Sequence, residues 1–243
     1  MKSIILAAGY ATRMGELTKD KPKTFLEIGE KKIIDHIIDN IPAEVNQINI
    51  VTNSIFLRQF KNWVHSSSKK DIINIIDDGS TCNENRVGAV KDMLLGINYK
   101  GRKDSLVIAS DNLFDFSLQG IIERFYRNKI DLVVATDIKD TKKASLFGVI
   151  KKNKKGIITE FIEKPSNPES TTISTGIYVI KKESIHFLQE YSKKGKNIDK
   201  LGDFISWFSK QKKVECFVPS GKWYDIGNIE CYEKAKKEFF EDY

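Results

Sequence analysis

The residues with the clearest chemical potential lie just after a short apolar run at the N-terminus. Gly9 and Arg13 fall in a loop of small residues that follows the run Ser3–Ala8. Such a loop lets backbone N–H groups approach phosphate oxygens, and an arginine can hold two of those oxygens at once. A second cation, Lys23, follows the rigid Pro22. The pattern favours a phosphate site, and a tight turn with surface cations is the alternative interpretation.

Other familiar catalytic patterns are missing. The glycine loop contains neither the Gly-x-Gly-x-x-Gly dinucleotide fingerprint nor the Gly-Lys-Ser/Thr of a Walker loop. His36, His65 and His186 lie on predicted helices away from the loop. The three cysteines have no spacing suited to a metal site, so neither a Ser/His/Asp triad nor a zinc centre is indicated.

Apolar runs alternate with amphipathic stretches through the first 140 residues. Strands are predicted over residues 3–8, 47–52, 71–76, 105–109 and 131–136, and helices over 32–41, 56–64, 86–97 and 117–127. This alternation predicts a parallel sheet with helices on both faces. In such a sheet, ligands bind beyond the carboxyl ends of the strands, where the glycine loop would lie.

The rhythm changes after residue 140. Strands are predicted over 147–151, 157–163, 173–180 and 214–218, and helices over 183–193, 198–210 and 229–240. We expect this second half to extend the sheet and to supply a lid over the substrate. The 243 residues suit one domain, since no repeat or linker divides them.

Composition limits the classes of function. Hydrophobic residues make up 40% and charged residues 30%, as in soluble globular proteins, and no apolar run approaches the ~20 residues that span a bilayer. The net charge of +7 suits an anionic partner, but the lysines are scattered and no nucleic-acid motif is present. Three cysteines without a C-x-x-C pair indicate reduced thiols, so a cytoplasmic location is expected, with no membrane or nucleic-acid partner.

Seven segments, taken in order, carry a family resemblance. They are Leu6–Met14, Lys19–Leu26, Ser110-Asp111-Asn112, Phe147-Gly148-Val149, Glu163-Lys164-Pro165, Ser174–Tyr178 and Trp223–Gly227. Together they resemble the signature of the sugar-1-phosphate nucleotidyltransferases, of the glucose-1-phosphate thymidylyltransferase type, in a short form without a C-terminal β-helix domain. The resemblance implies a Rossmann-like, GT-A-like α/β fold with a mixed, mostly parallel sheet. Within one domain, residues 1–140 would form a nucleotide-binding half and residues 141–243 a sugar-binding half.

The resemblance also implies the reaction. A sugar 1-phosphate oxygen attacks the α-phosphorus of an NTP and yields an NDP-sugar and pyrophosphate, with Mg²⁺ as cofactor. The expected substrates are a hexose 1-phosphate and dTTP or UTP. No general base is needed, because the second pKa of a phosphate monoester is about 6 and the nucleophile is already an anion. Cations and a metal ion are needed instead.

The resemblance assigns roles to individual residues. Arg13 would contact the triphosphate, Lys23 would bridge the α-phosphate and the sugar phosphate, and Lys164 would grip the sugar phosphate. The implied catalytic residues are Arg13, Lys23 and Asp111, and the implied metal ligands are Asp111 and Asp225. The implied nucleotide-binding residues are Ala8, Gly9, Thr12, Arg13, Gly79, Asn83, Gly88 and Asp111. The implied sugar-phosphate-binding residues are Asn112, Gly148, Glu163, Lys164, Thr175 and Gly176.

Several alternatives stay open. Relatives of the thymidylyltransferase type carry a Gln in the base-contact segment, but no Gln lies between Gln59 and Gln119, so the base is undecided. Asn83 or Asn85 could contact the base or cap a helix, and Ala11 stands where many relatives have a second loop glycine. Cytidylyltransferases for phosphocholine-like acceptors share the opening motif and are the main alternative. A catalytically weak regulatory subunit and a glycosyltransferase are further alternatives for the function. The oligomeric state is also open, and a homo-oligomer is one possibility.

Overall fold

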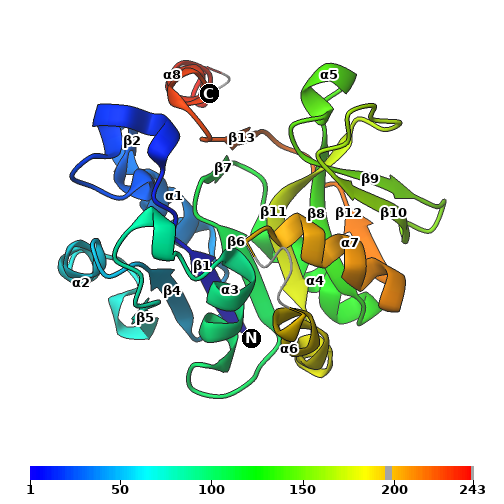
Figure 1. Cartoon of the computed structure of the whole chain (residues 1–243), viewed down its shortest axis with the longest axis horizontal. Helices are drawn as coiled ribbons and strands as arrows, with labels where there is room; N and C mark the ends of the chain where they lie inside the picture. Colours follow the sequence, from blue (N-terminus) through cyan, green and yellow to red (C-terminus); the bar gives the residue numbers. More distant parts are fainter. Residues whose placement is uncertain (195–198, 242–243) are drawn as a thin grey trace.

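A large mixed sheet forms the centre of the computed structural model, which describes residues 1–194 and 199–241 (Figure 1). Along its main path the strands are β10 (Ile158–Glu163), β9 (Gly148–Lys152), β11 (Thr172–Ile180), β6 (Ser105–Ala109), β1 (Lys2–Leu6), β4 (Ile48–Thr52) and β5 (Ile73–Asp77). Beside this path, β8 (Asp131–Asp137) pairs with β11, and β12 (Val214–Phe217) pairs with β8. Strands from both halves of the sequence therefore share one sheet.

Most of the strands run in one direction. The neighbours β5, β4, β1 and β6 pair in parallel, and so do β8 and β12. Strand β11 is antiparallel to β6, β8 and β9, and β10 is antiparallel to β9. Only β10 and β11 thus oppose the other strands of this sheet in the described residues, which confirms the predicted mixed, mostly parallel sheet.

Helices cover both faces of the sheet, as the alternating pattern predicted. Side chains of α1 (Ile33–Asn40), α2 (Leu57–Val64), α4 (Leu118–Asn128) and α8 (Ile229–Glu238) share one apolar core. Side chains of α3 (Ala89–Asn98), α6 (Ile185–Lys193) and α7 (Leu201–Gln211) share the other. Successive strand residues point to opposite faces, so Ile5 lies in the first core and Ile4 in the second.

Short elements went unpredicted. They are the strands β2 (Glu27–Ile28), β3 (Lys31–Lys32), β7 (Asn112–Phe114) and β13 (Trp223–Asp225), the helical turn α5 (Thr141–Ala144), and 3-10 turns that include η1 (Thr12–Thr18), η2 (Lys23–Phe25) and η4 (Asn83–Asn85). Helix α3 begins at Ala89 and not at Arg86, because Gly88 has a φ of 96° that a helix does not allow. Ile198, where the prediction began the next-to-last helix, lies outside the described residues.

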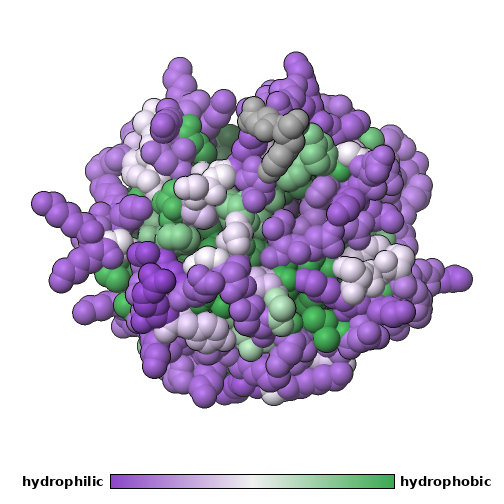
Figure 2. All heavy atoms as spheres, turned by 180° about the vertical axis from the view of Figure 1, so that it is seen from behind, coloured by the Kyte–Doolittle hydropathy of each residue, from purple (hydrophilic) through white to green (hydrophobic). Residues whose placement is uncertain are grey.

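The surface is largely hydrophilic. Figure 2 shows hydrophilic side chains spread over the face opposite to the view of Figure 1, with only small hydrophobic areas between them. The paired lysines Lys142 and Lys143, and Lys236 and Lys237, are exposed, whereas Lys69 is half-buried and donates to the Ile41 carbonyl. Within the described residues, none of the helices combines the length and apolar character needed to cross a bilayer.

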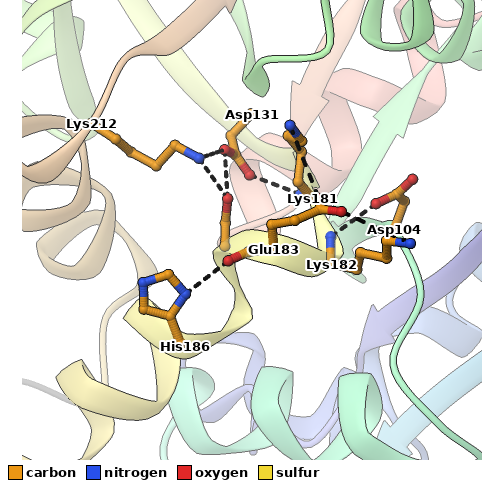
Figure 3. Close-up of polar contacts among 8 residues, drawn as sticks. Asp104, Asp131, Lys181, Lys182, Glu183, His186 and Lys212 are labelled. Carbon is orange, nitrogen blue, oxygen red and sulfur yellow. Dashed lines mark hydrogen bonds and ion pairs between the residues drawn. The ribbon is translucent and has the colours of Figure 1, made fainter.

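A buried carboxylate joins three segments of the second half to the sheet (Figure 3). Asp131, at the start of β8, is fully buried and accepts hydrogen bonds from the Lys181 backbone N–H and the Ser184 hydroxyl, each at 2.8 Å. The Lys212 ammonium lies 2.7 Å from the same carboxylate. These partners satisfy the charge of Asp131 and tie the end of β11, the start of α6 and the end of α7 together.

We predict that Asp131→Ala lowers the free energy of unfolding by about 3 kcal/mol, because it strips the buried partners of Asp131 of their acceptor. Denaturant titration of the whole chain measures this change. Asp104→Ala is the matched control, since Asp104 also accepts a backbone N–H, from Lys182 at 2.8 Å, but is not fully buried. The control should cost less than about 1 kcal/mol. Equal effects for the two variants would contradict the role given to Asp131.

Candidate functional site

Two adjoining cavities lie at the carboxyl ends of the central strands. The first has a volume of about 240 Å³ and the second about 470 Å³, and Ala109 and Asp111 line both. The pairing of β1 with β6 places the segment after Leu6 beside the segment after Ala109, and the Ser110 N–H donates to the Leu6 carbonyl at 3.1 Å. The cavities therefore lie where the strand pattern predicted ligand binding.

The first cavity contains part of the predicted nucleotide set. Its lining includes Ala8, Gly9, Lys23, Gly88 and Asp111. Three other predicted residues, Thr12, Gly79 and Asn83, line neither cavity. Arg13 lines the second cavity, on the opposite side of Asp111 from the predicted base contacts.

The asparagines of the predicted base segment have local partners. The side-chain oxygen of Asn85 accepts the backbone N–H groups of Thr81 and Cys82, each at 3.0 Å. The Asn83 side-chain oxygen accepts a hydrogen bond from Arg86 at 3.1 Å. Asn85 thus closes the turn η4 (Asn83–Asn85), and neither asparagine caps α3, whose N-cap position is Gly88.

The glycine loop keeps a left-handed turn even though an alanine occupies it. Ala11 has a φ of 49° and a ψ of 35°, and its carbonyl accepts the Met14 N–H at 2.9 Å. The Tyr10 hydroxyl donates to Ser80 at 2.9 Å and ties this loop to the segment after β5. The replacement of a glycine by Ala11 therefore leaves the turn in place at the expense of backbone strain.

A lysine and a carboxylate meet at the wall between the cavities. The Lys23 ammonium, carried by η2, lies 2.9 Å from the Asp111 carboxylate, which follows β6. Burial acts to raise the pKa of Asp111, but the charge and hydrogen bond of Lys23, a backbone hydrogen bond and the charge of Arg13 together lower the pKa below its ordinary value. Asp111 is therefore held as an anion beside a cation.

The pairing of β7 with β13 brings Asp225 to this wall. Asp225 lies opposite Asn112 in that small sheet, and the Ile226 N–H donates to the Asp111 carbonyl at 2.9 Å. Burial and the negative charge of Asp111 raise the pKa of Asp225 to about 6. The two predicted metal ligands are thus close enough in space for their charges to interact.

The second cavity collects the whole predicted sugar-phosphate set. Its lining includes Asn112, Gly148, Glu163, Lys164, Thr175 and Gly176. The residues come from β7, β9, β10 and β11, and from the turn after β10. Segments that are far apart in the sequence are therefore brought around one cavity, although no ligand contact tests their roles.

Two glycines leave the space that the Glu163 carboxylate occupies. A Cβ atom on Gly202, at the start of α7, would lie 1.9 Å from Oε2 of Glu163, and one on Gly148 would lie 3.1 Å from the same oxygen. Burial raises the pKa of Glu163. Sequence reasoning missed Gly202, because a glycine within a predicted helix carries no signal for a distant carboxylate.

Aromatic and polar residues complete the second cavity. Trp223 donates its indole N–H to the side-chain oxygen of Asn112, whose amide in turn donates to the Ala109 carbonyl at 2.8 Å. The rings of Trp223 and Phe147 meet edge to face with centroids 5.6 Å apart. Asn112 is therefore fixed by bonds to the end of β6 and to β13.

Comparison with known proteins settles the family. The sequence pattern described as "Nucleotidyl transferase" matches residues 2–241. The chain belongs to the nucleotidyl transferase family. This membership confirms the resemblance drawn from the seven segments.

Two relatives show how far this nucleotidyl transferase matches known proteins. It is 30% identical over 230 residues to the bifunctional protein GlmU of Methanococcus aeolicus, covering 93% of this chain and 51% of the relative. The chain thus spans about half the length of that relative. It is 25% identical over 249 residues to the UTP–glucose-1-phosphate uridylyltransferase AglF of Haloferax volcanii, covering 100% of this chain and 98% of the relative.

Solved structures share the fold. A UDP-glucose pyrophosphorylase complexed with UDP-glucose superposes with a TM-score of 0.84 at 22% identity, covering 100% of this chain and 99% of the other. A putative glucose-1-phosphate thymidylyltransferase from Bacillus anthracis gives a TM-score of 0.82 at 23% identity, covering 97% and 94%. These structures confirm the predicted fold class.

We predict that Ala11→Gly stabilises the nucleotidyl transferase by about 0.5–1 kcal/mol. It removes a left-handed strain of about 1–2 kcal/mol and adds a smaller loss of chain entropy. Thermal and denaturant unfolding measure the change. Ala235→Gly, in the middle of α8, is the matched control and should destabilise by about 1 kcal/mol or more. If Ala11→Gly destabilises as well, the turn does not carry the strain assigned to it.

Proposed function

We propose that this chain transfers a nucleotidyl group from an NTP to a sugar 1-phosphate and releases pyrophosphate. The observation that carries the proposal is the Lys23–Asp111 pair, 2.9 Å apart, on a wall that two cavities share. An NTP in the first cavity and a sugar phosphate in the second would meet at this wall. Holding two reactants in such an arrangement makes the step effectively unimolecular.

The cations explain how two anions can react. Lys23 lies where the α-phosphate and the attacking phosphate oxygen would approach each other, and it lowers their repulsion. Lys164 lies in the second cavity, where it would bind the sugar phosphate. Arg13 is exposed beside Asp111 and would hold two oxygens of the leaving pyrophosphate. Charge that develops on the leaving group is thereby stabilised in place.

Asp111 and Asp225 form a donor set that fits Mg²⁺. No cluster of three or more His, Cys, Asp or Glu side chains suited to a metal occurs among residues 1–194 and 199–241. Mg²⁺ is commonly held by one or two carboxylates together with water and substrate phosphates, so two carboxylates are enough. When bound, the ion would supply positive charge to the phosphate oxygens. Lys23 would then share Asp111 with it.

The substrates proposed are a hexose 1-phosphate and UTP or dTTP. The names of the AglF relative and of the UDP-glucose pyrophosphorylase structure support this choice. Glu163, fixed between two glycines, offers an acceptor for sugar hydroxyls in the second cavity. These substrates place the chain in nucleotide-sugar biosynthesis, in the cytoplasm where NTP is available.

A phosphocholine-like acceptor is the second candidate, because aromatic rings line the second cavity. Phe147, Phe161, Tyr178 and Trp223 all contribute to its wall. Aromatic faces attract quaternary ammonium groups, and Glu163 would add a negative charge. Lys164, Ser174 and Thr175 line the same cavity as Glu163, and these polar residues favour a sugar as the acceptor. One screen distinguishes the two acceptors.

A screen for pyrophosphate release tests the proposal. ATP, GTP, CTP, UTP and dTTP are each combined with hexose 1-phosphates, an N-acetylhexosamine 1-phosphate and phosphocholine. We expect release with UTP or dTTP and a hexose 1-phosphate, and its loss when EDTA removes the metal. Release only with CTP and phosphocholine would replace the proposed reaction by the second candidate. Absence of release with every pair would refute both.

We predict that Gly202→Ala raises the KM for the sugar 1-phosphate about tenfold, with the KM for the nucleotide unchanged. The added Cβ displaces the Glu163 carboxylate, and a hydrogen bond to a charged group is worth about 1.5 kcal/mol. Steady-state kinetics with each substrate varied in turn provide the measurement.

The matched control is Gly120→Ala, also a glycine within a helix. A Cβ on Gly120, in α4, meets nothing within 4 Å. This variant should leave both KM values unchanged and add up to about 1 kcal/mol of stability. Unchanged kinetics in Gly202→Ala would remove Glu163 from the sugar site.

A further inference from the structure

One carboxyl group in the first cavity has no partner. Asp92 lies in the first turn of α3, and its side chain is 6% exposed. Its Oδ1 is fully buried and has no hydrogen-bond partner among the residues that the structure describes. Asp92 lines the first cavity together with Gly88 and Ala89, so its carboxyl group belongs to the wall that a nucleotide would face.

Among residues 1–194 and 199–241, no cation is paired with this carboxyl group. Burial and the negative charges of Asp78 and Asp199 raise the pKa of Asp92 to about 7. Arg86 is near in sequence, but its guanidinium is paired with Asp199 at 2.8 Å. The other charged groups on neighbouring elements are engaged elsewhere or exposed: Lys23 pairs with Asp111, Lys2 of β1 bonds to carbonyls after Asn98 and at Ile97, and Lys91 of α3 is exposed.

A buried oxygen without a partner destabilises the folded chain, and more so when it is charged. Such an oxygen is expected where a ligand supplies the missing donor. The donor has to come from the nucleotide in this cavity. Phosphate groups at neutral pH offer acceptors only, so the donor belongs to the base or to the ribose.

The start of α3 adds donors beside this acceptor. Gly88, at the N-terminal end of the helix, has no side-chain cap, and Ala89 follows it in the cavity wall. The first N–H groups of a helix have no partner within the helix. A wall that offers free N–H groups next to a carboxyl oxygen complements a base edge with a carbonyl next to an N–H.

We propose that Asp92 recognises the base, accepting the N3–H of uracil or thymine while the N–H groups at the start of α3 donate to a neighbouring carbonyl oxygen. Cytosine and adenine have no N–H in the ring at this edge, so they fit less well. The inference rests on the proposed function, because it takes the first cavity as the nucleotide site. It makes Asp92 a residue that selects a base with a ring N–H beside a carbonyl, an edge that guanine shares with uracil and thymine.

Binding of nucleotides to the full chain, without sugar phosphate, tests the inference. Isothermal titration compares UTP, N3-methyl-UTP and CTP. Methylation of N3 removes the one hydrogen that Asp92 would accept. We expect the unmodified chain to bind UTP at least about tenfold more tightly than N3-methyl-UTP and than CTP. Asp92→Ala should weaken UTP binding about 10–100-fold and bring UTP and N3-methyl-UTP within a few-fold of each other.

Three further measurements keep the test decisive. Lys91→Ala, the exposed neighbour on α3, should keep the preference for UTP over N3-methyl-UTP. Asp92→Asn retains an acceptor oxygen and should keep part of that preference. Thermal unfolding should give Asp92→Ala a Tm no lower than that of the unmodified chain, because Oδ1 loses no partner. A folded Asp92→Ala chain with unchanged UTP binding and unchanged discrimination would overturn the inference.

The remaining outcomes separate the inference from the proposed function. Tighter binding of CTP than of UTP by the unmodified chain would overturn the role of Asp92 and leave nucleotidyl transfer intact. UTP binding with the expected discrimination, but no pyrophosphate release with any acceptor, would refute the proposed reaction and support base recognition by Asp92. Absence of binding by every nucleotide would overturn both.

Discussion

The pairing of β1 with β6 is the constraint on which the site depends. It sets Leu6 opposite Ala109, so the glycine loop and the Asp111 segment leave the sheet side by side. The ion pair of Lys23 with Asp111 then connects the segment after the glycine loop to the segment after β6. Because the backbone bonds of two buried parallel strands fix this register, the positions of the groups at the wall follow from the sheet and not from flexible loops.

The pKa values of the acidic residues in the site differ because these residues have different neighbours. Lys23 lowers the pKa of Asp111, whereas burial and the charge of Asp111 raise that of Asp225. The charge of Lys23 also acts on Asp225, but as a smaller effect than burial and Asp111. Asp92, which lines the first cavity, is paired with no cation among the residues that the structure describes. The same cavity thus contains an ionised, paired acid and a buried acid whose pKa is raised.

Hydrophobic patterning was sufficient to predict the sheet and the helices. Unbroken apolar runs such as those in β1 and β6 are clear signals of a strand, because both faces of a parallel strand are buried. The three-residue strands β7 and β13 escaped prediction, since so short a pairing leaves no periodicity to read. Yet this pairing is what brings Asp225 to Asp111. The proposed metal ligands could therefore be named from the motifs, whereas the pairing of β7 with β13 that brings them together could not be predicted.

The site residues likewise divide into those that sequence motifs predicted and those that depend on tertiary packing. The sugar-phosphate set was found through its motifs, and all of it lines one cavity. Asn83 was named because the resemblance places its segment at the base, but the segment forms the turn η4 and engages Asn83 with Arg86. Asp92 was missed because an aspartate on an amphipathic helix is ordinarily a surface residue. Its burial is decided by the packing of α3 on β1 and β4, which no local pattern reveals.

The reversed strand β11 explains why the second half of the chain abandons the β-α alternation. Its pairing with β8 shifts register between Ser174 and Ile177, and Gly176 within the shift has a φ of 79°. A Cβ on Gly176 would lie 3.2 Å from the Ala109 side chain and 3.3 Å from the Asn112 amide, so a glycine allows β11 to approach β6 and β7 closely. Thr175 and Gly176, within this irregularity, line the second cavity, so the register shift lies at its wall.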